Sequence, residues 1–533
     1  MIICDQLRPD FLHAYGADFI PTPNIDALAE NGAVFENAVT ASTVCAPARA
    51  SIVTGLSVSG HGGWTNNIPM PENTVYFANR LNDAGYMTAA VGCYDHAPLG
   101  NSCGYRYVCR TDEGKKNSEY LTYLRKKHPE AVNSFPKQTD DPYHFAYNEE
   151  DYYDRWACDR ATDFIESYVQ HHTVPDTSHL TENGGIPADD APFFLYCGFF
   201  SPHAPNLAPK EMIGRVDPEK IPDIWIGRRD EDLPAVERYR RAFLNPSEAL
   251  TDPEGMAKQR QALRVIYCEQ ICEIDDLVGR IVKSLKDNGI YENTTIIFTA
   301  DHGSMENDYN LVTKGPWPYS QQLFVPLIVS NQPGLKGRCD CLCGPIDVGA
   351  TALDIAGDEK VFGISRSLIK MADGSEPERE SFFSEFCDSC KTVVDKRYTF
   401  TYYPFTGVCA LYDRISDPRM AVDLGSDPEY AEVRCRMMAE VIDWLVLAKG
   451  IRIEAHDMVP PVREGIMKKR PGFLDDFDIA YPLSSQNAVE RVRMAGLDQN
   501  YNEFCKGHRI MAHYGVYFLS DEEAKDGDYR VIE

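Results

Sequence analysis

Four short apolar runs without a polar face leave this chain few possible folds. Met87–Gly92, Phe193–Phe199, Thr295–Thr299 and Phe324–Ser330 are apolar on both sides of an extended backbone and alternate with amphipathic stretches. Strands with two apolar faces are typical of parallel sheets that helices cover on both sides. The pattern therefore predicts an α/β fold with a mostly parallel sheet sandwiched by helices.

Helical periodicity appears between these runs. It is clear over Thr74–Asp83, which Gly85 ends, and over a long stretch from about Ala257 to Lys286. The polar, aromatic segment from Lys115 to Asp190 predicts inserted loops with one helix near Tyr152–Tyr168. Insertions of this kind often lie over the carboxyl ends of sheet strands, so we expect this segment to shape a substrate pocket.

The chain is long enough for more than one folding unit, because it has 533 residues. We expect a catalytic α/β domain over residues 1–375 and a smaller α+β subdomain over 376–450. In the subdomain, Thr392–Tyr403 and Val408–Tyr412 indicate hairpin-like strands. Residues 451–533 form a C-terminal extension without a recognisable motif.

The charge balance limits the possible partners. There are 53 Lys and Arg against 81 Asp and Glu, which gives a formal net charge of −28. Because such a surface repels phosphate backbones and anionic lipid, we expect no nucleic-acid and no membrane partner. An anionic substrate must then be attracted by a local cluster of positive groups. Oligomeric state has no signal in the sequence.

The same sequence leaves two compartments open. There is no apolar run of membrane-spanning length and no signal peptide, and 17 cysteines are typical of reduced thiols in a cytoplasmic protein. However, Met1 directly precedes the strand-like Ile2-Ile3-Cys4. If the natural chain begins upstream, we expect a periplasmic or secreted protein.

Two apolar runs far apart in the sequence end in similar polar dipeptides. Ile2-Ile3-Cys4 leads into Asp5-Gln6, and Thr295–Thr299 leads through Ala300 into Asp301-His302. Since the carboxyl ends of parallel strands share one crevice, these four side chains can meet there. Carboxylates, an amide oxygen and an imidazole favour Ca²⁺, Mg²⁺ or Mn²⁺ over a thiolate-bound zinc. Alternatively, each Asp merely caps a turn after its strand.

A third element is the segment Cys45-Ala-Pro-Ala-Arg-Ala-Ser-Ile-Val-Thr-Gly55. Pro47 suits a first helical turn and Thr54-Gly55 a helix end, so Cys45 is expected at a helix N-terminus, which favours anions. Arg49 lies four residues later, on the same face of the helix. Its guanidinium can hold an oxyanion beside position 45. A buried thiol followed by a surface charge is the alternative.

Taken together, these segments resemble the type I sulfatases of the alkaline-phosphatase-like superfamily. The resemblance is most specific at Cys45–Gly55 and spans about residues 1 to 450. Further segments agree in order and spacing: Pro23–Ala29, Pro202-His203-Ala204-Pro205, Thr299–Gly303, Lys314, Val325–Val329, Leu411-Tyr412-Asp413 and Asp417-Pro418.

The resemblance implies a cofactor and a set of roles. Cys45 would be oxidised to formylglycine by a maturation enzyme, and its hydrated form would attack sulfur. Asp5, Gln6, Asp301 and His302 would bind one divalent cation together with residue 45, with Ca²⁺ favoured and Mn²⁺ or Mg²⁺ as alternatives. Asp301 would also accept the nucleophile's proton. His203 matches the family's general acid, and Lys314 matches a lysine that contacts the sulfate or the bridging oxygen.

The chain also departs from the family pattern. Where many members carry Gly-Lys-x-His, this chain has Gly92-Cys-Tyr94-Asp-His96. We therefore expect Tyr94 or His96 in the substrate pocket, and Asn66 or Asn67 as a further amide contact to the anion. Gln6 replaces a second Asp, as in the phosphonate monoester hydrolase and choline-sulfatase-like branch.

These expectations converge on a sulfuric ester hydrolase that cleaves the sulfate monoester of a sugar or small alcohol. Gln6 and the missing lysine leave a phosphonate monoester or phosphodiester hydrolase as the first alternative. A catalytically silent binder of anionic glycans, which uses Arg49 and Lys314, is the second.

Overall fold

The computed structural model describes most of the first 448 residues. It covers residues 1–448 except 67, 69, 72–73, 95–100, 112–117, 132–135, 137–142, 228–251, 312, 316–317, 387–388 and 405–406, together with 516–517 and 530–531. Most of the 451–533 extension thus lies outside the described residues, except that β13 (Val516–Tyr517) pairs with β14 (Arg530–Val531). No described helix is both long and apolar enough to cross a membrane.

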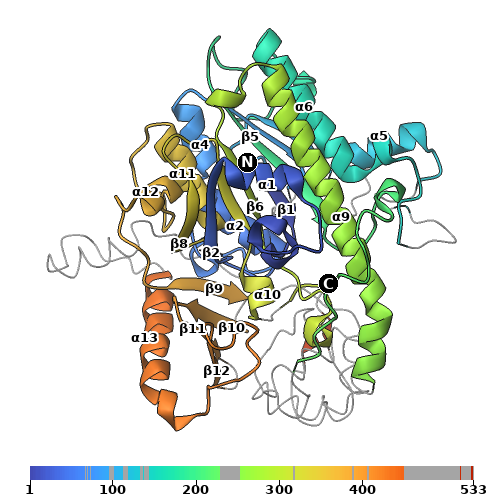
Figure 1. Ribbon diagram of the computed structural model, residues 1–533. Coiled ribbons are helices and arrows are strands. Elements are labelled where there is room, and N and C mark those ends of the chain that lie inside the picture. The colour runs from blue at the N-terminus through green and yellow to red at the C-terminus, as the bar shows by residue number, and fades with distance from the viewer. Residues whose placement is uncertain are drawn as a thin grey trace, which may run out of the picture.

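An eight-stranded sheet forms the centre of the molecule (Figure 1). The strand order is β4-β3-β5-β1-β6-β7-β2-β8. The strands are β1 (Ile2–Asp5), β2 (Gly32–Ala38), β3 (Met87–Gly92), β4 (Tyr107–Arg110), β5 (Phe193–Pro202), β6 (Ile296–Ala300), β7 (Leu327–Ser330) and β8 (Gly337–Cys343). The described sheet is mostly parallel, as the apolar runs predict, and its central strands are buried.

One strand corrects the prediction. The run Phe324–Ser330 was expected to be parallel, but β7 runs antiparallel to both neighbours, β6 and β2. A parallel connection needs a crossover of a dozen or more residues, usually a long helix. Between β6 and β7 the structure describes only the short η8 (Asp308–Asn310) and α10 (Ser320–Leu323), so the chain returns along the sheet in the opposite direction.

Helices cover both faces of the sheet (Figure 1). One face packs against α1 (Pro23–Glu30), α6 (Tyr153–His171) and the long α9 (Pro253–Asp287). The other carries α2 (Cys45–Thr54), α4 (Phe77–Asp83), α11 (Val348–Ile355) and α12 (Leu368–Asp373). The segment Lys115–Asp190 therefore does more than form loops over a pocket, because α6 packs on β3 and β5, with α5 (Glu119–Lys127) near β4.

A second, antiparallel sheet follows in the chain. Its order is β12-β11-β10-β9, and α13 (Ala431–Ala448) packs on it (Figure 1). The strands are β9 (Phe382–Phe386), β10 (Cys390–Val394), β11 (Tyr398–Tyr403) and β12 (Val408–Asp413). The stretch Thr392–Tyr403, which was expected to be hairpin-like, is the β10–β11 hairpin.

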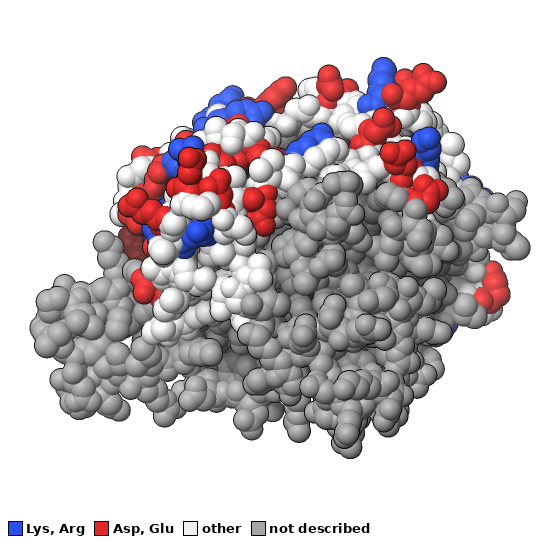
Figure 2. Space-filling model, turned by 90° about the horizontal axis from the view of Figure 1, so that it is seen from below, with Lys and Arg blue, Asp and Glu red and all other residues white. Residues whose placement is uncertain are grey.

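The described surface of one face mixes the two signs of charge. Seen from below in Figure 2, acidic and basic side chains are interspersed on the part of that face that is not grey. The described residues of this face thus present no continuous positive surface.

Candidate active site

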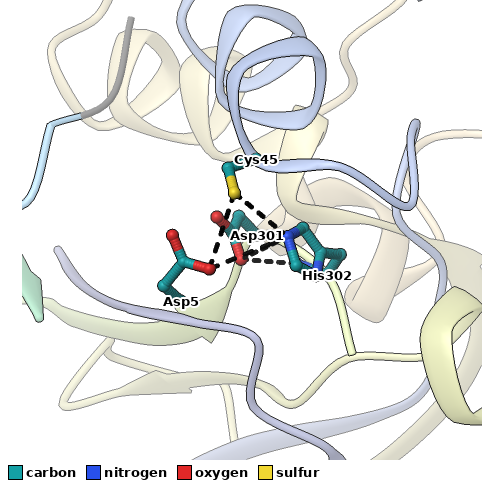
Figure 3. Close-up of side chains that lie close together, drawn as sticks. All are labelled: Asp5, Cys45, Asp301 and His302. Atoms are coloured by element: carbon teal, nitrogen blue, oxygen red, sulfur yellow. Dashed lines mark hydrogen bonds and ion pairs between the residues drawn. The ribbon is translucent and has the colours of Figure 1, made fainter. Parts of the chain in front are cut away.

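Strand register brings the polar strand ends to one edge of the central sheet. Cys4 in β1 lies opposite Ala300 in β6 and Phe199 in β5, so Asp5 and Asp301 emerge side by side. The start of α2 lies above them and places Cys45 over the two carboxylates (Figure 3). One ligand atom from each of Asp5, Cys45, Asp301 and His302 lies within 4.8 Å of all the others.

The four side chains are fully buried and face a common centre (Figure 3). Cys45 Sγ lies 3.7 Å from Asp5 Oδ1 and 3.5 Å from His302 Nε2. His302 Nε2 lies 3.7 Å from an oxygen of each carboxylate. Its other ring nitrogen, Nδ1, is 2.7 Å from the Gly303 carbonyl, which fixes the ring and leaves Nε2 facing the centre.

Arg49 lies behind this group rather than at its opening. Its Nε donates to Asp301 at 2.8 Å and one terminal nitrogen donates to Asp5 at 3.2 Å. The other terminal nitrogen donates to the Tyr196 hydroxyl at 2.6 Å and the Cys93 carbonyl at 2.9 Å. The guanidinium was expected to hold an oxyanion; in the structure its four hydrogen bonds go to protein acceptors, and the side chain is enclosed in the core. Arg49 thus orients the two carboxylates.

Gln6 has two features of a residue that holds a cation. Its backbone is left-handed, with φ at 71°, a conformation that is unfavourable for residues other than glycine. Its Nε2 donates to Ser304 Oγ at 3.0 Å, whereas the buried Oε1 has no hydrogen-bond partner among the described residues. A buried, unsatisfied amide oxygen is costly. The donor set of two carboxylates, an imidazole and this oxygen fits a hard divalent cation.

Lys314 and His203 lie on the other side of Cys45. Lys314 Nζ contacts Cys45 Sγ, lies 3.7 Å from Asp5 Oδ1 and is 2.5 Å from His203 Nε2. His203 follows the end of β5 and is 9% exposed, and its Nδ1 contacts the Ala204 carbonyl. A cation and an imidazole therefore stand together beside residue 45.

The charges of these groups shift one another's pKa. Burial raises the pKa of Asp5, but the Lys314 ammonium, His203 and Arg49 outweigh it and hold that pKa far below its usual range. Burial and then Lys314 lower the pKa of His203 to about 3. Burial disfavours the charged form of Lys314, yet Asp5 and Cys45 raise its pKa. At neutral pH the resting pair is thus an ammonium beside a neutral imidazole.

The remaining predicted pocket residues lie in different places. Asn66 Oδ1 accepts from the Ala46 N–H at 3.1 Å, so its side chain caps the start of α2 next to Cys45. Tyr94 is buried, packs against Tyr196, and donates its hydroxyl to the Ser102 carbonyl at 2.6 Å. That hydroxyl is used within the core, so Tyr94 does not join the Cys45 group. Asn67 and His96 lie outside the described residues.

Two supporting residues have no sequence motif. Tyr196 in β5 accepts from Arg49, and Ser304 accepts from Gln6. Tyr196 alternates with apolar neighbours in a buried strand, which predicts a core residue and gives no sign of a polar contact. Ser304 follows Asp301-His302-Gly303 directly, and proximity to that motif is the one signal that points to it.

Comparisons with known proteins agree with this geometry. The family model described as Sulfatase matches residues 1–358. The arylsulfatase of Clostridium perfringens is 29% identical over 473 residues, which span 81% of this chain and 91% of the relative. The multifunctional alkaline phosphatase superfamily protein PehA of Trinickia caryophylli is 27% identical, over 83% of this chain and 94% of its own.

Solved structures share the fold. The phosphonate monoester hydrolase of Agrobacterium radiobacter superposes with a TM-score of 0.70 over 84% of this chain and 95% of its own, at 23% identity. At that identity the likeness concerns the architecture alone. It agrees with an alkaline-phosphatase-like sheet followed by a small antiparallel one.

Proposed function

Because this chain belongs to the sulfatase family and is a sulfuric ester hydrolase, we propose that it cleaves a sulfate monoester of a sugar or small alcohol at Cys45. The observation that carries this proposal is that Asp5, Cys45, Asp301 and His302 lie together at the N-terminus of α2. The proposed nucleophile is the hydrated formylglycine made from Cys45 by a maturation enzyme.

The cation would be held by Asp5, Gln6, Asp301, His302 and the modified residue 45. We favour Ca²⁺ because the donors are mainly oxygens, with Mn²⁺ and Mg²⁺ as alternatives. When bound, such an ion lowers the pKa of a coordinated hydroxyl and polarises the sulfate oxygens. The unsatisfied Gln6 Oε1 and the His302 ring turned toward the centre support this assignment.

The proton steps are assigned to the side chains around Cys45. Asp301 lies with its carboxylate in the same group and would accept the proton of the attacking hydroxyl. On the other side, Lys314 Nζ is 2.5 Å from His203 Nε2. We assign donation of a proton to the leaving alcohol oxygen to His203. Lys314 would also face the negative charge of the ester.

The test combines a mass measurement with an activity measurement. The tryptic peptide that contains residue 45 is expected to carry an aldehyde in place of the –CH₂SH group. Sulfate release from an aryl sulfate is expected to be abolished by Cys45→Ala and retained by Cys272→Ala, a matched change at another buried cysteine. Equal release by the wild type and Cys45→Ala would refute the proposal. An intact thiol without bound cation would instead favour a glycan-binding protein.

A second candidate activity is hydrolysis of phosphonate monoesters or phosphodiesters. It is motivated by Gln6 at the cation site, where many sulfatases have Asp, and by Tyr94 and His96 in place of the usual lysine segment. Turnover of sulfate and phosphodiester substrates with the same leaving phenol separates the two. We expect the higher kcat/KM for the sulfate.

We further propose that residues 1–375 form the catalytic domain and 376–450 a subdomain attached to it. The 451–533 extension is assigned no role. The inserted segment Lys115–Asp190 is proposed to select the alcohol, and a panel of sulfated sugars assayed by sulfate release tests this substrate class.

A further inference from the structure

The turn that carries His203 is held close to the end of β5. The His203 N–H donates to the Phe200 carbonyl at 3.1 Å. The Phe200 ring lies against the imidazole, with the ring centroids 4.7 Å apart. Any shift of Phe200 or Ser201 would therefore move the imidazole relative to Lys314 and Cys45.

A buried carboxylate on α6 accepts hydrogen bonds from the end of β5. Asp154 Oδ1 accepts from the Phe200 N–H at 2.6 Å, and Oδ2 accepts from the Ser201 N–H at 2.9 Å. The side chain is completely buried, and no cation is among the groups that shift its pKa in the described residues. Burial raises the pKa of Asp154 to about 6. Burying a carboxylate without a cation beside it is costly, and here two backbone N–H groups of this segment offset that cost.

A hydroxyl network fixes the same turn from the other side. Tyr152 OH lies 2.8 Å from Ser201 Oγ and donates to the Leu207 carbonyl at 2.8 Å. Gln270 Nε2 on α9 reaches Ser201 Oγ at 3.3 Å. Residues before and after His203 are thus tied to α6 and α9, which are rigid elements of the sheet covering.

We propose that Asp154 is a positioning residue for proton donation, because it anchors the Phe200 and Ser201 amides that set the place of the His203 imidazole. This inference rests on the proposed role of His203 as the general acid. Asp154 does not touch the reacting atoms. It acts by keeping Nε2 within reach of the leaving oxygen, so its loss affects the substrates that most need that proton.

The test is the dependence of kcat/KM on the leaving group. Asp154→Asn keeps the shape but faces one of the two amides with an NH₂ donor instead of an acceptor. For aryl sulfates with acidic phenols, we expect a loss of about 3-fold or less. For weakly acidic phenols and alkyl sulfates, which need protonation, we expect a loss of about 10- to 100-fold. His203→Ala is expected to show the same steepening, and the double variant to lose little more than His203→Ala alone.

Asp275→Asn is the matched control. Asp275 is also a buried carboxylate on a sheet-covering helix that accepts two backbone N–H bonds, from Asn24 and Ile25, and burial raises its pKa to about 6 as well. Asp275 lies on α9 and binds the start of α1, not the turn that carries His203. It should lower stability without changing the leaving-group dependence. If Asp154→Asn lowers kcat/KM by one factor for all leaving groups, or if Asp275→Asn also steepens the dependence, the inference is wrong.

The outcomes keep this inference separate from the proposed function. If His203→Ala leaves the dependence unchanged, the general-acid role fails and the inference fails with it. If His203→Ala steepens the dependence and Asp154→Asn does not, the inference alone fails. Should Asp154→Asn not fold, Ser201→Ala and Tyr152→Phe, which loosen the same turn, replace it with the same expected steepening of smaller size.

Discussion

At the level of single residues, Arg49 determines the geometry of the proposed cation site, because it binds both Asp5 and Asp301. A lysine has one point charge and cannot bridge two carboxylates with a planar fork. We expect Arg49→Lys to weaken Ca²⁺ binding by about 10- to 100-fold, as the loss of a ligand-orienting partner usually does. Calorimetric titration of Ca²⁺ measures this effect without reference to activity.

Arg215→Lys is the control for that change. Arg215 also pairs with a carboxylate, that of Asp276, but on the surface. Its replacement should leave Ca²⁺ affinity unchanged. An Arg49→Lys protein that binds Ca²⁺ as tightly as the wild type would show that the carboxylates are held by other contacts.

Residues at strand ends were predictable, and residues behind them were not. Asp5, Asp301 and His302 follow apolar runs, and the sheet brings such positions together, as the sequence predicts. The hydrogen bonds of Arg49 to Asp5, Asp301 and Tyr196 were not predictable. Helix periodicity gives the face on which a side chain lies, but not how deeply it is buried. Asp154 gave no signal either, because its partners are backbone amides of a distant strand.

At the level of elements, the end of α2 depends on a glycine. Gly55 has φ at +66°, and a Cβ placed there would lie 2.7 Å from the Phe362 carbonyl oxygen, which is backbone and cannot rotate away. We expect Gly55→Ala to lower the free energy of unfolding by about 2 to 4 kcal/mol and to reduce activity by shifting α2. Denaturant unfolding and sulfate release report the two effects.

Gly85→Ala provides the comparison. Gly85 also has a positive φ, at +90°, but a Cβ there meets nothing within 4 Å. It therefore reports conformational strain alone, about 1 kcal/mol. If both variants lose the same free energy of unfolding, the backbone around Phe362 can move to accommodate the added Cβ.

The contact between α6 and α9 contains a group that makes stability depend on pH. Glu273 on α9 is buried beside Arg155 on α6, and burial raises its pKa to about 7. Its folded pKa lies above its unfolded value of 4.5, so the native state binds more protons between those pH values. The contribution of Glu273 to stability therefore falls as pH rises from about 4.5 to 7.

Glu273→Gln should remove this dependence. Relative to the wild type, the variant should gain up to about 3 kcal/mol in free energy of unfolding between pH 4.5 and pH 8. Denaturant unfolding across that range measures the difference. Glu292→Gln, a change at an exposed position, should run parallel to the wild type. If the free energy of unfolding of Glu273→Gln also runs parallel to the wild type across this pH range, the Glu273 carboxylate is exposed to water and its pKa is not raised.

Element types were easier to predict than their directions and ends. β3 has the same bounds as the predicted run Met87–Gly92, because every residue of this run suits a strand that is buried on both faces. The antiparallel course of β7 depends on the connection before it, which no local pattern reveals. Likewise, α4 starts at Phe77 rather than Thr74, since Asn79 accepts the Tyr76 N–H and caps the helix there.

At the level of the whole molecule, a buried ion pair inside the small sheet also contacts the short helix that follows α2. Glu385 in β9 accepts from the Ser59 N–H in α3 (Val58–His61) at 2.9 Å and from Lys391 Nζ in β10 at 2.6 Å. Lys391→Met would leave Glu385 as an uncompensated buried charge. We expect this change to lower the free energy of unfolding by about 3 to 5 kcal/mol.

Scanning calorimetry tests this link. The wild type should unfold in one transition that includes both sheets, and Lys391→Met should shift that transition down or split it. Lys396→Met is the control, because Lys396 pairs with Glu378 at the exposed surface, where a pair contributes about 1 kcal/mol or less. Two separate transitions in the wild type would show that the sheets unfold independently.

The burial of Cys45 would also fix the order of folding and of the proposed modification. Only 1% of this residue is exposed once α2 has packed over the carboxylates, and Lys314 already contacts its sulfur. A second protein large enough to oxidise the thiol cannot reach it there. The proposed modification would therefore have to be made before α2 packs, and a molecule that folds first would keep its thiol, however much of the oxidising partner it later meets.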